Sequence, residues 1–503
     1  MMLTRSRTLS LVSLSLVAMA AMGGCDDVKE APPTSPTPSD GGASVDATSL
    51  DAGVDADPGI DAALDNAGPG ADDAPLLDST DGGGQGCAEP TAAAIEHNKT
   101  IMADETWAAG LHDVTFDVAI RNNATLTIEP CAIIRVIADR GISVGSGNEG
   151  DGGKLVARGT ADRPIVIQDK TGARWNDLLV NPKGEVDLAY VTFKNGGGTY
   201  ARAGGSLHLY GDQYKPIQQL GKVDHVTILD SGKYGVVLEG HAAFTDGSGD
   251  LTVTRAGVMA IRVNAPAMGT IPSGTYIGNG TDAIRIMGSG GYELIDADVT
   301  LHDRGVPYVV GGDGAFNEMS VQGADGTSPL LTIEAGVVLK FGKVSSGLFI
   351  ERASTTNAAR GALRVLGTLA KPVIFTSNEA PPAPGDWTGI HFRGNPDARD
   401  KVDYAIVEYA GGDTGTRGFS CGTPVSPDPS SNEAAIAIFG QPASPFVTNT
   451  VLSKSAANGI ERAWTGTPLD LEPSNTFSEV KWCKQTYPRP QMGTCPDPPP
   501  CPQ

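Results

Sequence analysis

Residues 331–341 read LTIEAGVVLKF, and residues 126–136 read LTIEPCAIIRV, so one eleven-residue phrase occurs twice in the chain. Three further matches follow in the same order: GTADRPI at 159–165 with GTLAKPV at 367–373, Trp175 with Trp387, and VDLAYV at 186–191 with VDYAIV at 402–407. The offset between the copies grows from 205 to 216 residues, as small insertions would produce. Ordered matches of this kind indicate an internal duplication. We predict two related modules, over residues 87–292 and 293–480.

A shorter period runs through the first module and into the second. Apolar pairs recur every 23 to 29 residues, starting at Leu207, Val236, Ile261, Ile284, Tyr308 and Leu331. Short alternating apolar runs between Gly and Asn turns are typical of β-strands. The leucine-rich-repeat pattern is absent, and the blades of a β-propeller would be longer. We therefore expect an all-β fold, a right-handed parallel β-helix of about a dozen coils, with alternate side chains facing a shared interior.

The second module resembles the right-handed parallel β-helix proteins found among bacterial cell-surface lipoproteins and adhesin-like proteins. The resemblance rests on the phrase at 331–341, on GTLAKPVIFT and on the Trp-Thr-Gly-Ile that begins at Trp387. It is good over residues 293–465 and weaker over 100–240. It implies the fold and a surface location. It does not imply a reaction, because β-helices serve as lyases, hydrolases and passive surface modules.

The first 24 residues have the features of a lipoprotein signal peptide. Two arginines precede an apolar run from Leu9 to Met22, which is shorter than a membrane span and interrupted by serines. The sequence MGGC at 22–25 resembles the lipobox of bacterial lipoproteins, with Met in place of the commoner Leu. We therefore expect lipidation of Cys25, with palmitate among the acyl chains. Several acyl chains on one residue give stable membrane anchoring. An ordinary signal peptide that happens to contain a cysteine is the alternative.

Residues 25–86 contain 13 Asp and one Glu against the single Lys29, and no aromatic residue. Such a segment cannot bury enough apolar surface to fold, so we predict a disordered, extended tether. Weak Ca²⁺ binding by this acidic tract is the alternative. The net charge of −22 argues against nucleic acid as a partner. We expect an exported protein, anchored in the outer membrane and exposed at the cell surface. The inner membrane is the alternative location, because an Asp directly after the lipidated cysteine, as Asp26 is here, retains some Gram-negative lipoproteins in the inner membrane.

Six cysteines follow Cys25, an even number in a chain that we expect to be exported, which favours disulfides. They are Cys87, Cys131, Cys421, Cys483, Cys495 and Cys501. Cys131 stands where the second module has Gly336, so our preferred pairing joins Cys87 to Cys131 and closes the first coil. The other four would serve the far end, where residues 481–503 form a Cys- and Pro-rich tail. Cys421 falls in a loop predicted over residues 411–430. Other pairings remain open. The sequence lacks the Cys-x-x-Cys spacing that would indicate a metal site.

One column of polar residues is predicted to face outward from the ladder. It contains His208, Arg262, Arg285, Arg364 and His391. In a strand reading Ala-Ile-Arg-Val the arginine faces out, so Arg262 and Arg285 should lie about 5 Å apart on neighbouring coils. Stacked cations need an acid or an anionic ligand between them, and Asp282 is a candidate acid. The column is either a solvated face with local ion pairs or a surface for an acidic polysaccharide.

Motifs of known chemistry are missing from the sequence. It contains no nucleophile elbow, phosphate loop, zinc-protease helix or dinucleotide fingerprint. The turn from Asp246 to Asp250 could hold Ca²⁺, although Asp-Gly turns are ordinary; otherwise we expect no cofactor. We predict a non-enzymatic, lipid-anchored surface protein with a structural, adhesive or glycan-binding role. Its partners would be a surface polysaccharide or another surface protein. The alternative is a carbohydrate-active β-helix enzyme, a polysaccharide lyase or a glycoside hydrolase.

Overall fold

The computed structural model describes most of the chain after residue 85. The described residues are 86–148, 150–201, 204–288, 294–311, 318–324, 326–343, 346–353, 356, 358–414, 433–464, 469–486 and 501. They belong to one compact unit, Asp81–Gln503. Within these residues, no helix is long and apolar enough to cross a membrane. The predicted signal peptide, the predicted lipidation site Cys25, the predicted tether up to residue 85, Cys421 and Cys495 lie outside the described residues.

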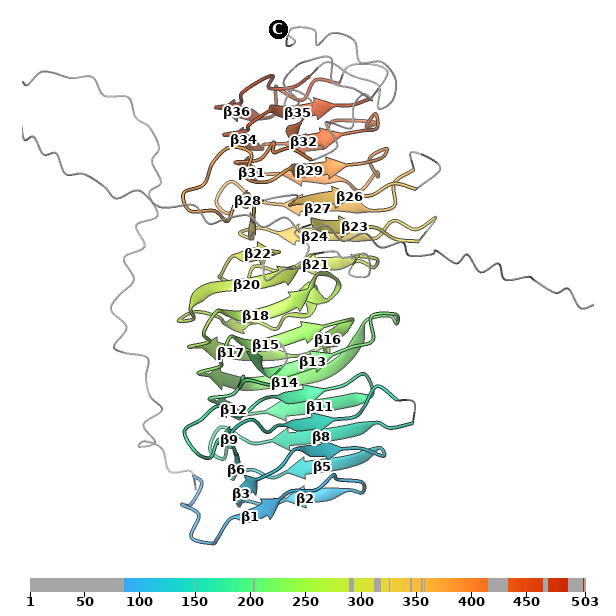
Figure 1. The fold of residues 1–503 in the computed structure, drawn as a ribbon. Coiled ribbons are helices and arrows are strands. Elements are labelled where there is room, and N and C mark those ends of the chain that lie inside the picture. Colours follow the sequence, from blue (N-terminus) through green and yellow to red (C-terminus); the bar gives the residue numbers. More distant parts are fainter. Residues whose placement is uncertain are drawn as a thin grey trace, which may run out of the picture. The chain divides into compact units, whose positions relative to one another are not determined.

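The described residues form a right-handed parallel β-helix whose strands fall into four sheets (Figure 1). Sheet A contains β1 (Ile95–His97), β2 (Glu105–Trp107), β3 (Gly110–Val114), β5 (Ala124–Ile128), β6 (Ala132–Val136), β8 (Gly153–Arg158), β9 (Ile165–Asp169), β11 (Gly184–Ala189), β12 (Val191–Lys194), β14 (Gln218–Leu229), β16 (Ala242–Phe244), β17 (Gly249–Thr254) and β19 (Gly274–Thr275). Sheet B contains β4 (Val118–Ile120), β7 (Ile142–Val144), β10 (Leu178–Val180), β13 (Gly205–Tyr210), β15 (Tyr234–Glu239), β18 (Met259–Asn264), β20 (Thr281–Met287), β22 (Tyr308–Val310), β25 (Val338–Phe341), β28 (Val373–Ser377), β31 (Ala405–Glu408), β34 (Val451–Ser453) and β36 (Thr476–Ser478).

The two smaller sheets belong to the second half of the chain. Sheet C contains β23 (Glu318–Val321), β26 (Gly347–Ile350), β29 (Gly389–Phe392), β32 (Ala434–Ile438) and β35 (Asn458–Arg462). Sheet D contains β21 (Val299–Leu301), β24 (Leu330–Glu334), β27 (Ala362–Leu366), β30 (Lys401–Asp403) and β33 (Val447–Thr448). A short 3₁₀ helix, η2 (Ala265–Thr270), follows β18. Sheet B takes one strand from each coil and has 13 strands, which confirms the predicted fold and its dozen or so coils.

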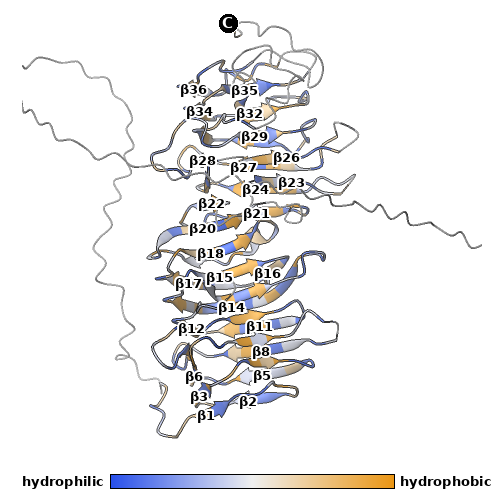
Figure 2. Ribbon diagram, in the orientation of Figure 1, coloured by the Kyte–Doolittle hydropathy of each residue, from blue (hydrophilic) through white to orange (hydrophobic). Residues whose placement is uncertain are grey.

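Alternation of apolar and polar residues explains why these segments form half-buried strands. In β5, Leu126 and Ile128 are buried in the interior while Thr127 between them is partly exposed. Successive side chains of a strand point to opposite faces, so an alternating strand supplies one face to the core and one to solvent. Figure 2 shows hydrophobic residues concentrated along the strands, as on β8, β15 and β16. The core is thus a continuous apolar column inside the coils.

The duplicated phrases adopt the same local structure in both modules. Trp175 and Trp387 are both buried, and each indole Nε1 donates a 2.8 Å hydrogen bond to a backbone carbonyl, of Lys194 and of Glu408 respectively. Cys131 has φ of 70° and its counterpart Gly336 has φ of 91°. Both therefore occupy the left-handed region that glycine adopts most easily. The sequence match between the modules is a match of turns and core contacts.

The ladder predicted from the apolar pairs holds for most of its length and then fails. Leu207, Val236, Ile261, Ile284 and Tyr308 are register partners on consecutive strands of sheet B, as predicted. The next partner of Tyr308 is Leu339 of β25. Leu331, the predicted partner, lies in β24 and pairs with Val299 of sheet D. The prediction is wrong at this step because the chain passes through an additional strand position between β20 and β21, so that the later strands lie in other sheets than their counterparts in the first module.

This change rotates the two modules by one sheet about the axis of the coils. Trp175 directly precedes β10 in the first module, and its counterpart Trp387 directly precedes β29 in the second, so these two strands correspond. β10 lies in sheet B, whereas β29 lies in sheet C. After β20 the chain passes through an additional position at Ile295, which bridges to Val321 of β23 in sheet C. Equivalent faces of the two modules therefore point in different directions.

Two corners of the first module have left-handed backbone at residues other than glycine, and each of them recurs on three successive coils. One corner holds Tyr190, His225 and Asp250, with φ of 49°, 52° and 49°. The next holds Asn195, Asp230 and Arg255, with φ of 54°, 59° and 56°. Left-handed backbone is disfavoured for side chains with a Cβ, and Asn, Asp and His tolerate it better than most. Because the coils stack in register, side chains at one corner project next to one another.

Candidate functional site

The five residues of the predicted outward column do not lie in one column. His208, Arg262 and Arg285 belong to sheet B, and Arg262 is the register partner of Arg285, as predicted. Arg364 lies in β27 of sheet D, and His391 lies in β29 of sheet C. The single-column prediction is wrong for these two residues. The one-sheet rotation of the second module puts His391 in sheet C, and Arg364 belongs to β27, which like its first-module counterpart β8 lies outside sheet B.

The sheet B residues form a buried network of charges. His208 is fully buried, with Nδ1 3.7 Å from Asp177 Oδ2 and Nε2 3.2 Å from Glu239 Oε2. The other carboxylate oxygen of Glu239 accepts a hydrogen bond from Arg262 Nη1. Val237 is the register partner of both His208 and Arg262 and separates them in the sheet. We call Asp177, His208, Glu239 and Arg262 the sheet B charge network.

Burial and charge act in opposite directions on this network. Burial favours the neutral forms of His208 and Glu239, but each group stabilises the charge on the other. Asp177 and Glu239 together raise the pKa of His208 above its ordinary value. His208 and Arg262 lower the pKa of Glu239 to about 2. The network thus places the imidazole between two carboxylates that favour its protonated form.

The two sheet B arginines of the predicted ligand face are engaged within the protein. Arg262 pairs with Glu239, and Arg285 Nη1 donates a 2.8 Å hydrogen bond to the backbone oxygen of Gly311. The acid expected between the arginines, Asp282, instead accepts the backbone N–H of Asn279 at 2.8 Å. The local ion pairs considered from the sequence are therefore present, with Glu239 as the acid. Sequence reasoning missed Glu239 because it ends a strand two positions beyond the arginine column.

His391 is buried on sheet C and held neutral. Its Nε2 lies 3.2 Å from the backbone oxygen of Thr388, and its ring lies 5.0 Å from that of Phe349. Burial first, and then the charge of Arg393, lower the pKa of His391 to about 3. The Arg393 guanidinium pairs with Glu351 at 2.6 Å and covers the Phe349 ring at 3.9 Å. His391 is thus a packed residue and is not open to an external ligand.

Two disulfides lie among the described residues. Cys87 bonds to Cys131, which is the pairing suggested by the loss of the turn glycine. This bond ties the chain before β1 to the turn between β5 and β6. Cys483 bonds to Cys501 after the last strand. Both ends of the stack, where unpaired strand edges are exposed, thus carry a covalent link.

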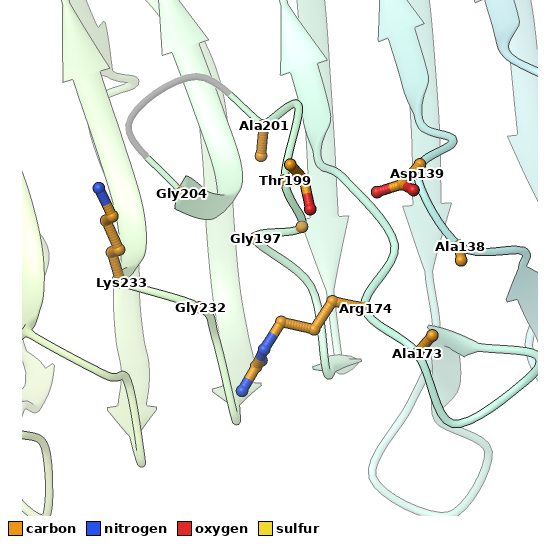
Figure 3. Close-up of a pocket in the computed structure, with 11 residues that line it drawn as sticks. Ala138, Asp139, Ala173, Arg174, Gly197, Thr199, Ala201, Gly204, Gly232 and Lys233 are labelled. Atoms are coloured by element: carbon orange, nitrogen blue, oxygen red, sulfur yellow. The ribbon is translucent and has the colours of Figure 1, made fainter.

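A groove lies at the corners between sheets A and B, and we call it the corner groove (Figure 3). Its volume is about 580 Å³. Asp139 and Lys233 lie at opposite ends, with Thr199 between them and Arg174 along one edge. All of its other lining residues are Gly or Ala. The floor is therefore largely backbone, and the functional groups are two cations, one carboxylate and one hydroxyl.

Close packing of turns fixes the positions of the two cations. Arg174 Nη1 donates hydrogen bonds to the backbone oxygens of Gly196, at 3.3 Å, and Asp230. A Cβ on Gly204 would lie 2.9 Å from Lys233 Cγ, so the glycine makes room for the lysine side chain. The volume falls within the range of about 300–1,000 Å³ that is usual for ligand sites. Two cations and exposed backbone in such a groove suit a polar, acidic ligand.

Asp224, His225 and Asp250 form a cluster that could hold a metal ion. One ligand atom from each residue lies within 4.8 Å of the others. The sequence had suggested Ca²⁺ in the turn from Asp246 to Asp250. In the structure Asp246 accepts a hydrogen bond from Gln219 Nε2 at 3.1 Å, while Asp250 lies beside His225. The Asp250 side chain thus contacts His225 of the preceding coil.

Comparison with known families supports the fold and leaves the activity open. A family model described as "Pectate-lyase like beta helix domain" matches residues 317–416. The matched part covers β23 to β31 and does not include the corner groove or the sheet B charge network. Neither the curated proteins nor the solved structures give a significant match to the chain.

Proposed function

We propose that this protein binds an acidic polysaccharide in the corner groove and is held at a bacterial cell envelope by a lipid on Cys25. The groove carries the proposal, because it presents Arg174 and Lys233 in a chain whose net charge is −22. Uronate carboxylates would pair with these cations. Sugar hydroxyls would bond to Thr199, to Asp139 and to backbone groups. The pectate-lyase-like match supports a carbohydrate ligand.

The groove can be tested with the full chain and two polymers. We expect the wild-type protein to bind polygalacturonate more tightly than neutral dextran, with an affinity that falls as salt rises. Lys233→Ala should weaken polygalacturonate binding about threefold to tenfold, since one charge-assisted contact is lost. Isothermal titration calorimetry measures both effects. The matched control is Lys183→Ala, which removes an exposed lysine outside the groove. Equal weakening in both variants would contradict the proposal.

The lipid anchor calls for a separate experiment in the producing bacterium. We expect labelled palmitate to enter the wild-type protein and the protein to stay in the membrane fraction after a high-salt wash. Cys25→Ala should abolish both, while Met22→Leu, which restores the commoner lipobox residue, should keep both. Palmitate labelling that survives Cys25→Ala would refute the anchor. Protease treatment of intact cells then tests whether the β-helix lies on the cell surface.

A carbohydrate-active enzyme is the second candidate, and the family match favours it. Polysaccharide-cleaving enzymes use acid and base groups that reach the substrate. In the sheet B charge network and around His391 these groups are instead buried and paired. We therefore place ligand binding first. Release of reducing ends or of unsaturated products from polygalacturonate by the wild-type protein would reverse this order.

A further inference from the structure

We infer that Asp224, His225 and Asp250 form a surface zinc site on the first module. The three residues come from two neighbouring coils, with Asp224 and His225 in β14 and Asp250 in β17. Their side chains are about half exposed, so a metal ion can reach them from solvent. The site shares no residue with the lining of the corner groove.

The hydrogen-bonding state of the imidazole supports a cation beside it. His225 Nδ1 lies 2.7 Å from Asp224 Oδ1, and Nε2 lies 3.5 Å from Asp250 Oδ2. A neutral imidazole has a single N–H. The short contact assigns that N–H to Nδ1, which leaves the Nε2 lone pair directed at a carboxylate oxygen of Asp250. Two acceptors that face each other in this way repel unless a proton or a metal ion lies between them.

The distance between those acceptors matches zinc coordination. Zinc binds imidazole nitrogen and carboxylate oxygen at about 2.0–2.1 Å with tetrahedral angles, which separates two ligand atoms by roughly 3.3–3.4 Å. The observed separation of His225 Nε2 and Asp250 Oδ2 is 3.5 Å. These two atoms would be the protein ligands, and water would complete the coordination. Asp224 would act as a positioning residue, the carboxylate that fixes the tautomer of a zinc-bound histidine.

The fold orients the imidazole before any metal binds. His225 and Asp250 occupy the same left-handed corner on neighbouring coils, so their side chains project together. Below them, at the same corner, the Tyr190 ring stacks on the imidazole at 4.4 Å with an angle of 14° between the planes. The ring is therefore held on one side by Tyr190 and at Nδ1 by Asp224. Ligands held in place lose little conformational freedom on binding a metal.

The donor set favours zinc over calcium. Imidazole is a good ligand for zinc, copper and nickel, whereas calcium takes six to eight oxygen ligands. The cluster would offer calcium two carboxylates and a nitrogen donor, fewer than the six to eight oxygen ligands that it takes. Asp250 thus belongs to a zinc site and not to the calcium turn that the sequence suggested.

Calorimetric titration of the full-length protein with zinc chloride, after treatment with a chelator, tests the site. We expect the wild-type protein to bind one zinc ion more than His225→Ala or Asp250→Ala. Asp224→Asn should keep the stoichiometry and weaken binding about tenfold or more, as loss of a carboxylate that orients a ligand does. Excess calcium chloride should not displace the zinc. Acidification should weaken binding, because protons compete with zinc for its ligands.

The control is His302→Ala, which removes a partly exposed histidine whose Nδ1 lies 3.0 Å from Glu334 Oε2. This variant should bind as much zinc as the wild-type protein. Circular dichroism checks that each variant is folded. The inference is overturned if His225→Ala keeps the wild-type stoichiometry, if calcium displaces the zinc, or if the wild-type protein binds no zinc up to millimolar concentrations.

Discussion

Replacing Glu239 by alanine is expected to destabilise the folded protein by about 3–5 kcal/mol, the usual cost of removing one partner from a buried ion pair. The change leaves His208 fully buried with only Asp177 beside it, at 3.7 Å. It also removes the carboxylate that pairs with Arg262. Urea unfolding followed by circular dichroism measures the loss as a lower midpoint. Hydrogen exchange should locate the loosened backbone in β13, β15 and β18.

The matched control is Glu185→Ala. Glu185 pairs with Lys154 at 3.3 Å, and both side chains are well exposed, at 63 % and 46 %. Exposed pairs of this kind contribute less than about 1 kcal/mol. Similar midpoints for Glu185→Ala and Glu239→Ala would show that the sheet B charge network is not a stabilising element.

The same network gives the stability of the wild-type protein a dependence on pH. The pKa of Glu239 falls to about 2 on folding, so its contribution is present above its ordinary value of 4.5 and is lost as the pH falls toward 2. The pKa of His208 rises on folding, so its contribution is complete below 6.5 and is lost as the pH rises through the folded value. Stability from this network is therefore greatest at mildly acidic pH, and Glu239→Ala should weaken both dependences.

Trp387→Ala should have an effect of similar size, about 3–5 kcal/mol, through a cavity in the core. Trp387 is 1 % exposed, stacks on Phe341 at 4.4 Å and donates a hydrogen bond to the backbone of Glu408. Trp387→Phe keeps a stacked ring and loses the N–H donor, so it should lie between alanine and the wild-type protein. Thermal and urea unfolding rank the three proteins.

A tryptophan outside the core provides the control for this series. Trp482 is 42 % exposed, and Trp482→Ala should change stability by no more than about 0.5 kcal/mol. Equal losses for Trp482→Ala and Trp387→Ala would contradict the assignment of Trp387 as a shared core anchor of the duplicated module.

The fold was predictable because its constraints act locally and leave marks in the sequence. The turn that needs left-handed backbone is occupied by Cys131 in one module and by Gly336 in the other, within otherwise matching phrases. The buried indoles of Trp175 and Trp387 each donate a hydrogen bond to the backbone carbonyl that ends a following strand, β12 and β31 respectively. Each such position must satisfy a nearby backbone requirement, so aligning the copies was enough to find the coils and the Cys87–Cys131 link.

The predicted site failed where the requirement was not local. The apolar pair at Leu331 has the right spacing for the next rung of sheet B, and only the path of the chain after β20 assigns it to sheet D. His208 and His391 alternate like outward residues, yet side chains from other coils bury them. The groups of the zinc cluster also come from different coils, and each alone resembles an ordinary turn residue.

The disulfide between Cys87 and Cys131 also determines how the β-helix would carry a mechanical load. A pull on the chain before Cys87 passes through the sulfur bridge into the turn that follows β5. Residues 88–130, with β1 and β2 among them, then form a closed loop that bears no tension. In the reduced protein the same pull would reach the hydrogen bonds between β1 and β3 first and break them one after another. Oxidation of the two cysteines thus keeps the load away from the hydrogen bonds between β1 and β3.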